Sequence, residues 1–344
     1  MPLPKIYPYF YRILLIFFAF ALCTAAFAQQ RYPARNVVWD AKLQKQVSFL
    51  SDPLCGGRES GTKGAVEAAV WIERRFKEAG LYPMLCADSL STRESYSQSF
   101  RTESGTVGHN IVGFMNGSRK IHGDEYIIVG AHYDALGTLG GVHYPSADAN
   151  ASGVVAAVSL AEMFSLSKVI GRAYFKSIIF VAFDGTLKNR AGSRALMNEI
   201  ENGRLIDPVS GKAIKKEMVK LMVNLDQIGA TLSPLSSGRE DYLLAVDGGT
   251  LPSRESALLD WCNSIFGTSL ELCHSYYGSE NFTSVFFRIT DQNAFASAGI
   301  PSVLFTSGIT LNNNKPRDDA RSLNYPVFRR RIYLIWHWLE NMMY

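Results

Sequence analysis

The chain has 344 residues and a formal net charge of +4, and 47% of its residues are hydrophobic. This composition supports a large buried core, and nothing in the charge indicates a nucleic-acid partner. The length fits one large α/β domain, with or without a small insertion, since α/β enzymes commonly exceed the usual length of about 100–200 residues per domain.

The N-terminus has the features of a secretory signal peptide. Lys5 and Arg12 precede an uncharged, mostly apolar run, residues 13–28, which ends in Ala-Phe-Ala. The run is shorter than the roughly 20 residues of a membrane-spanning helix, and its small-residue end suits signal peptidase. We expect residues 1–28 to be removed, leaving a periplasmic or secreted chain, residues 29–344, without stable membrane insertion. A retained N-terminal anchor is the alternative.

Four cysteines remain after that cleavage. In an oxidising compartment they allow one or two disulfides, and Cys262 and Cys273 are the nearest pair in sequence. No CxxC spacing indicates a cysteine metal site.

Short apolar runs alternate with amphipathic stretches along the chain. This pattern predicts an α/β fold, a three-layer sandwich in which helices cover both faces of a mostly parallel central sheet. The first clear helix is predicted over residues 61–81, where apolar residues recur at spacings of three and four. Further elements are predicted in this order: strand 126–131, helix 153–164, strand 177–183, helix 191–201, strands 221–226 and 242–246, helix 253–265, strand 302–306 and helix 328–342.

Two polar stretches are predicted to be loops. Residues 202–219 contain many charges with Gly and Pro, and residues 312–324 are predicted to form a rim loop. In open α/β sheets, ligands bind where loops leave the carboxyl ends of strands, so functional residues are expected there.

His132 and Asp134 follow the strand predicted over residues 126–131. Side chains alternate along an extended chain, so the two point the same way. A carboxylate beside a histidine can accept one ring N–H and leave the other nitrogen for a metal, and we therefore expect Asp134 to orient His132. A structural hydrogen-bonded pair explains these two residues alone equally well.

Two further carboxylates extend this pattern. Asp148 lies in a small-residue loop before a helix, where it can either bridge two cations or cap the helix. Asp226 ends an apolar strand, where a carboxylate is costly unless it is paired or liganded. With His132 they predict one zinc ion, held by one nitrogen and two carboxylates, with an open coordination position.

Five ordered motifs resemble those of the co-catalytic zinc aminopeptidases. That family includes the secreted bacterial leucyl aminopeptidases and aminopeptidase Y, and it is related to glutamate carboxypeptidase II and the glutaminyl cyclases. The resemblance runs from about residue 45 to the C-terminus and includes an upstream CGGRESGT segment at residues 55–62. The motifs are GAHYDALG at 130–137, ADANASG at 147–153, FVAFDG at 180–185 with Gly192-Ser193, NLDQIG at 224–229 and AGIP at 298–301.

The resemblance implies a parallel-sheet zinc hydrolase with two metal ions in its active members. One metal would be bound by His132 and Asp226, a second by a glutamate and a late histidine, and Asp148 would match the carboxylate that bridges both. Another glutamate would act as general base on the metal-bound water.

Five positions depart from this family pattern. Thr186 occupies the general-base position, and Leu187 and Asn314 occupy the positions of the second metal's glutamate and histidine. Ala149 replaces a carboxylate common beside the bridging aspartate, and Gln292 replaces a histidine. The ligands expected for the first metal remain, so the sequence predicts one zinc where active relatives bind two.

Three functions are compatible with these departures. The first is a non-catalytic or weakly active relative whose cleft binds a peptide or a protein N-terminus, since loss of a general base alone costs about 10²–10⁴-fold in rate. The second is an active single-zinc exopeptidase with a substitute base, for which His143 is the local candidate, although an exposed loop histidine is the simpler explanation of that residue. A glutaminyl cyclase-like activity is disfavoured. The glutaminyl cyclases resemble single-zinc members that retain the bridging aspartate with the ligand glutamate and the late histidine, whereas this chain has lost that glutamate and histidine and retains His132 and Asp226.

Overall fold

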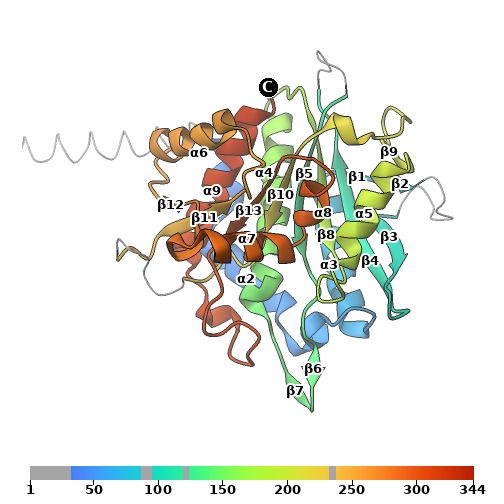
Figure 1. Cartoon of the computed structure of the whole chain (residues 1–344), viewed down its shortest axis with the longest axis vertical. Coiled ribbons are helices and arrows are strands. Elements are labelled where there is room, and N and C mark those ends of the chain that lie inside the picture. Colours follow the sequence, from blue (N-terminus) through green and yellow to red (C-terminus); the bar gives the residue numbers. More distant parts are fainter. Residues whose placement is uncertain (1–31, 87–94, 119–123, 232–237) are drawn as a thin grey trace, which may run out of the picture.

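The computed structural model describes residues 32–86, 95–118, 124–231 and 238–344 (Figure 1). The expected signal peptide, residues 1–28, lies outside the described residues. The α-helices are α2 (Asp40–Leu50), α3 (Lys63–Glu78), α4 (Ser152–Val169), α5 (Ala191–Glu201), α6 (Ser253–Ile265), α7 (Glu280–Ile289), α8 (Asn293–Ala296) and α9 (Tyr325–Met342). Short helical turns are η1 (Pro33–Val37), η2 (Pro53–Arg58), η3 (Ala147–Ala151), η4 (Lys216–Met218), η5 (Tyr276–Gly278) and η6 (Ala320–Ser322).

The described residues form one large sheet and two small ones. The strands are β1 (Tyr82–Pro83), β2 (Leu85–Cys86), β3 (Ser97–Arg101), β4 (Val107–Met115), β5 (Tyr126–His132), β6 (Thr138–Leu139), β7 (Val142–His143), β8 (Ser177–Phe183), β9 (Leu205–Ile206), β10 (Val219–Leu225), β11 (Tyr242–Val246), β12 (Glu271–Cys273) and β13 (Ser302–Thr306). The large sheet has the order β1-β4-β8-β5-β10-β13-β11-β12, and β3 also pairs with β4. β8, β5, β10 and β13 are mutually parallel, whereas β4 and β11 flank them in antiparallel orientation.

Helices cover both faces of the large sheet (Figure 1). One apolar cluster joins the sheet to α2, α3, α4 and α9, and a second joins it to α5 and α8. In β5, Ile127 and Val129 belong to the first cluster, and Tyr126 and Ile128 belong to the second. This two-residue alternation is that of a strand with both faces buried. The predicted three-layer α/β sandwich is therefore confirmed.

Helix α4 lies in the interior. Within the described ranges, Ala147–Val169 is the helical stretch long and apolar enough to cross a membrane, and 78% of its apolar window is buried inside the protein. Burial against the sheet accounts for its apolar surface on all sides, because a helix without a polar face is typical of a protein core.

Several details differ from the sequence prediction. The stretch 202–219, predicted as a loop, contains β9 and η4. The sequence analysis did not predict β3, β4 or α7. Cys262 and Cys273 are free thiols, so the disulfide considered for this pair is absent from the structure.

Candidate functional site

The site lies at the carboxyl ends of three neighbouring parallel strands. His132 ends β5, Asp226 follows β10, and the turn at residues 184–187 follows β8. Because β8, β5 and β10 are adjacent and parallel, their carboxyl ends meet at one edge of the sheet. The sequence prediction of this edge is correct.

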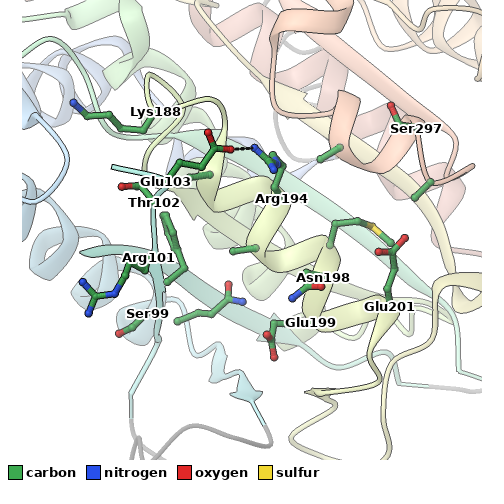
Figure 2. Close-up of a pocket in the computed structure, with 17 residues that line it drawn as sticks. Ser99, Arg101, Thr102, Glu103, Lys188, Arg194, Asn198, Glu199, Glu201 and Ser297 are labelled. Carbon is green, nitrogen blue, oxygen red and sulfur yellow. Dashed lines mark hydrogen bonds and ion pairs between the residues drawn. The ribbon is translucent and has the colours of Figure 1, made fainter. Parts of the chain in front are cut away.

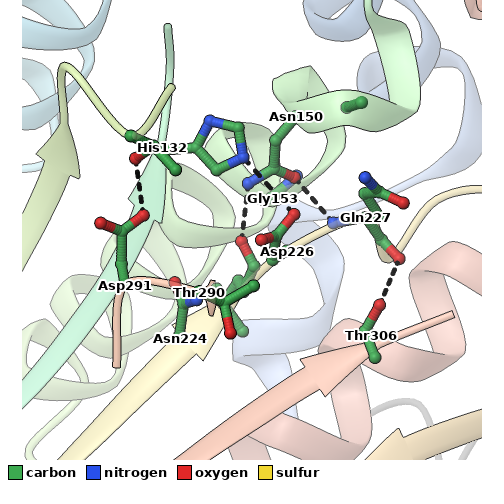
Figure 3. Close-up of polar contacts among 12 residues, drawn as sticks. His132, Asn150, Gly153, Asn224, Asp226, Gln227, Thr290, Asp291 and Thr306 are labelled. Carbon is green, nitrogen blue, oxygen red and sulfur yellow. Dashed lines mark hydrogen bonds and ion pairs between the residues drawn. The ribbon is translucent and has the colours of Figure 1, made fainter. Parts of the chain in front are cut away.

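His132 and Asp226 contact each other directly (Figure 3). Their Nε2 and Oδ1 atoms are 3.4 Å apart, and both side chains are almost fully buried. Two atoms that share one tetrahedral zinc at about 2.0–2.2 Å are separated by a similar distance, so the pair retains the geometry of two metal ligands. When His132 is protonated, the same two side chains also form an ion pair that needs no metal.

The protonation of His132 depends on two carboxylates. Burial lowers the pKa of His132, but the negative charges of Asp226 and Asp134 outweigh burial and raise this pKa well above its ordinary value. A protonated imidazole compensates part of the negative charge that gathers at these strand ends.

Asp134 orients the site mainly through backbone contacts. Its carbonyl oxygen lies 3.0 Å from the Nδ1 atom of His132, whereas its carboxylate Oδ1 is 3.6 Å from that atom. The carboxylate accepts hydrogen bonds from the backbone N–H groups of Thr186 and Leu187, at 3.0 and 3.1 Å. Asp134 therefore joins the end of β5 to the turn after β8.

Asp148 uses one carboxylate oxygen for hydrogen bonds, and its other oxygen has no partner. Its Oδ1 accepts hydrogen bonds from the backbone N–H groups of Gly229 and Ala230, at 2.9 and 3.0 Å, and from the Ser152 hydroxyl at 3.0 Å. Its Oδ2 is buried without a hydrogen-bond partner. Burial raises the pKa of Asp148 despite these donors. The carboxylate joins its loop to the segment after β10.

Asn150 makes a second connection to the end of β10. Its side chain accepts from the N–H groups of Gly153 and Gln227, both at 2.9 Å, and donates to the carbonyl of Leu225 at 2.8 Å (Figure 3). Gly153 is required there, because a Cβ atom would lie 2.2 Å from the Leu225 oxygen. Asn150 thus fixes the backbone on both sides of Asp226.

Thr186 is hydrogen-bonded to the buried carboxylate of Asp291. Its hydroxyl donates to Oδ2 of Asp291 at 2.7 Å, and the Ser193 hydroxyl donates to Oδ1 at 2.5 Å. Burial raises the pKa of Asp291, while His132, Ser193 and Thr186 oppose that shift. Next to Thr186, the Leu187 side chain is 50% exposed. The turn after β8 therefore presents an apolar side chain.

The remaining predicted residues lie at the periphery. Asn314 is exposed in a turn with a positive φ of 56°, beside Asn313, whose side chain accepts from Gln227 at 3.2 Å. His143 lies in the β6–β7 hairpin with its Nε2 3.4 Å from the carbonyl oxygen of Ser51. Its prediction as a substitute base gains no support, because its observed partner is a backbone carbonyl.

Two buried charged residues that the sequence analysis did not select hold the surrounding loops. The Arg58 guanidinium donates to the carbonyls of Leu50, Tyr133, Pro145 and Ser146. Arg58 lies in the CGGRESGT segment. Its role could not be predicted from the sequence, because all four of its acceptors are backbone carbonyls, which do not depend on residue type.

Asp318 binds backbone N–H groups of the same region, whereas Arg58 binds backbone carbonyls. Its carboxylate accepts from the backbone N–H groups of Asp148 at 2.9 Å and Ala149 at 3.2 Å. Burial raises its pKa to about 7. Backbone contacts of Arg58 and Asp318 therefore determine the course of the loop that carries Asp148.

As placed in this structure, His132 and Asp226 do not complete a catalytic zinc site by themselves. Zinc in such sites takes three protein ligands, and His132 and Asp226 provide two. Among the described residues, no group of three or more His, Cys, Asp or Glu side chains could hold a metal ion. The predicted third ligand, Asp148, does not join this pair in such a group: its Oδ1 accepts from the amides of Gly229 and Ala230, and its Oδ2 is buried without a hydrogen-bond partner.

A comparison with protein families identifies one match. The model of peptidase family M28 matches residues 110–339, which include all the strand-end residues described above. No curated protein matches the chain.

Solved structures with the same fold include aminopeptidases and glutaminyl cyclases. The LapA aminopeptidase of Legionella pneumophila is 14% identical, with a TM-score of 0.66 over 92% of this chain and 75% of that chain. The zinc aminopeptidase BSAP from Bacillus subtilis is 14% identical, with a TM-score of 0.63 over 88% of this chain and 95% of that chain. Fimbriiglobus ruber glutaminyl cyclase is 18% identical, with a TM-score of 0.65 over 88% and 95% of the two chains. At these identities the likeness establishes the fold alone.

Proposed function

Since the chain belongs to peptidase family M28, we propose that it is a non-catalytic member that binds peptides at the strand ends where active relatives cleave them. The observation that carries the proposal is the donor set. His132 and Asp226 are the two potential metal ligands that contact each other, and no third His, Cys, Asp or Glu completes a metal-binding group with them in the described chain.

The turn after β8 supports the same proposal. A general base must reach the proton that it removes, but Thr186 instead donates its hydroxyl proton to Asp291. Leu187 replaces a charged metal ligand with an exposed apolar side chain, which favours contact with an apolar side chain of a peptide. The family acts on peptides, so a peptide or a protein N-terminus is the expected ligand.

The N-terminal sequence supports a periplasmic or secreted location of the mature chain, residues 29–344, as one domain. N-terminal sequencing of the protein secreted by a bacterial host tests this part, with Gln29 as the expected first residue.

Peptide binding is tested by isothermal titration of the dialysed protein with tripeptides that have a free N-terminus and leucine, alanine or aspartate as first residue. We expect leucine to be preferred, and Leu187→Arg to weaken its binding at least tenfold. The matched control is Val169→Arg, since Val169 is also exposed, at 81%, but ends α4 away from the strand-end site.

Equal binding by the wild type and Leu187→Arg would contradict the proposed contact. Steady hydrolysis of the same tripeptides that is lost in Asp226→Ala would instead support the single-zinc exopeptidase.

A further inference from the structure

Strand β3 is an edge of the large sheet. Within the described residues it pairs only with β4, in antiparallel register that places Ser99 opposite His109. Val112 N–H donates to the Tyr96 carbonyl and Thr102 N–H donates to the Thr106 carbonyl, both at 2.8 Å, at the two ends of this pairing.

Hydrogen-bonded and non-hydrogen-bonded pairs alternate in an antiparallel ladder. Even-numbered residues of β3 are therefore bonded to β4, and the backbone groups of Ser99 and Arg101 point outward. No hydrogen bond from these outward groups is found within the described ranges of the chain. An unpaired edge of this kind is a template for another extended chain.

A groove follows this edge on one face of the sheet. The α5 groove, with a volume of about 690 Å³, lies between residues 98–103 and one side of helix α5 (Figure 2). Its polar lining includes Lys188, Arg194 and Glu201.

A second cavity lies on the opposite face. The α3 pocket, with a volume of about 360 Å³, is lined by Val66 and Val70 of α3 together with Ser97, Val107 and His109. Val66, Val70 and Val107 are 51%, 60% and 41% exposed. One edge strand is thus flanked by a polar groove on one face and by an apolar pocket on the other.

We propose that β3 binds an extended peptide segment of a partner protein by strand addition, with apolar side chains in the α3 pocket and charged side chains in the α5 groove. Successive side chains of an added strand point to opposite faces of the sheet, so an alternating apolar and charged sequence matches the two cavities. This site borders the strand-end site at the turn after β8, where Asp184 lines the α3 pocket and Lys188 lines the α5 groove. It differs in the kind of contact, since backbone hydrogen bonds of β3 supply much of its affinity.

The two ends of the α5 groove differ in charge, and this difference predicts where the peptide has basic and acidic residues. At the Thr102 end, Arg194 is closely paired with Glu103 at 2.9 Å, whereas Lys188, whose side chain is 38% exposed, is paired only at 4.0 Å, with Glu59. At the other end of α5, Glu201 forms no ion pair with any described residue, whereas its neighbour Glu199 is paired with Arg204. The complementary peptide therefore has a basic residue near Glu201 and an acidic residue near Lys188.

The test uses two fluorescein-labelled, acetylated and amidated decapeptides that alternate valine with charged residues. In one the charged residues change from lysine to glutamate along the chain, and in the other the order is reversed, because the direction of the added strand is not known in advance. Fluorescence anisotropy with the full mature chain should show saturable binding of one peptide in preference to the other.

Two variants of Ser99 test whether the outward backbone groups of β3 bind the peptide. Ser99→Pro removes an outward N–H and should weaken binding at least tenfold, whereas Ser99→Ala retains that N–H and should bind within twofold of the wild type. Edge strands tolerate proline, and circular dichroism confirms folding. If Ser99→Pro does not fold, peptides N-methylated at alternate residues give the same comparison, and the pattern of methylation that abolishes binding identifies the paired side.

Asp226→Asn serves as the strand-end control and should leave decapeptide binding unchanged. Absence of binding by the wild type, or equal binding by Ser99→Pro and the wild type, would overturn the proposal. A concentration-dependent dimer in light scattering that is lost in Ser99→Pro would also overturn it, by assigning the edge to a second copy of the chain.

Discussion

The Nε2 atom of His132 lies 3.4 Å from Oδ1 of Asp226, so the two residues that keep the family's first metal position form an ion pair with each other. Removing either partner leaves the other buried without its counter-charge, which is commonly destabilising by about 3–5 kcal/mol. The ion pair therefore gives His132 and Asp226 a structural role that needs no metal.

Asp148 provides the first test of this account. Asp148→Ala leaves the backbone N–H groups of Gly229 and Ala230 without their acceptor, and we expect it to lower the free energy of unfolding by about 2–4 kcal/mol. Asp148→Asn retains an acceptor oxygen and should cost less than half as much. Urea denaturation of both variants measures this difference.

Zinc binding by the same variants separates a structural role of Asp148 from a ligand role. We expect titration of zinc to give the same weak affinity for the wild type and Asp148→Asn. A loss of zinc affinity of tenfold or more in Asp148→Asn would restore Asp148 to the metal site.

Thr186 provides the second prediction. Thr186→Val removes the hydroxyl that donates to the buried carboxylate of Asp291, and the free energy of unfolding should fall by about 1–3 kcal/mol. Thr186→Ser keeps the donor and is the matched control. A free energy of unfolding of Thr186→Val equal to that of the wild type would contradict a contribution of this hydrogen bond.

The fold was predictable because apolar periodicity is strong in the buried elements. The runs that form β5, β8 and β13 are fully buried on both faces, and their apolar residues leave little choice of structure. Strand β3, with the sequence SQSFR, is polar and half-exposed, so no alternation distinguishes it from a loop. Its structure depends on pairing with β4.

The strand-end site was predictable in position and less so in detail. His132 and Asp226 followed from carboxyl strand ends, and the structure brings them together. The role of Asp148 as a ligand stays a prediction, and a sequence does not reveal that the amides of Gly229 and Ala230 lie within reach of its Oδ1 atom. Arg58 was missed for the same reason, since all its acceptors are backbone carbonyls.

His337 provides a pH prediction at a site remote from the strand ends. Its ring is stacked on Phe266 with centroids 3.9 Å apart, and its Nε2 accepts from the Arg35 guanidinium. Burial, with a smaller effect of the Arg35 charge, lowers the pKa of His337 to about 2. The folded protein therefore keeps this ring neutral at pH values where the unfolded chain is protonated.

Stability linked to His337 is present above pH 6.5 and is lost as the pH falls, because the unfolded state then binds the extra proton. The loss is about 1.4 kcal/mol per pH unit, or about 2 kcal/mol between pH 7 and pH 5. His337→Gln retains an acceptor for Arg35 and should lack this component. Urea denaturation at both pH values measures it, and the same pH dependence in both proteins would contradict the assignment.

The most direct test of a non-catalytic function is the turnover of a panel of aminoacyl-4-nitroanilides by the purified mature chain at saturating zinc, measured beside an identically purified Asp226→Ala variant. We predict that the two proteins release nitroaniline at the same background rate, because His132 and Asp226 alone do not form a catalytic zinc site. Zinc-dependent turnover by the wild type that disappears in Asp226→Ala would contradict the account and establish a working hydrolase.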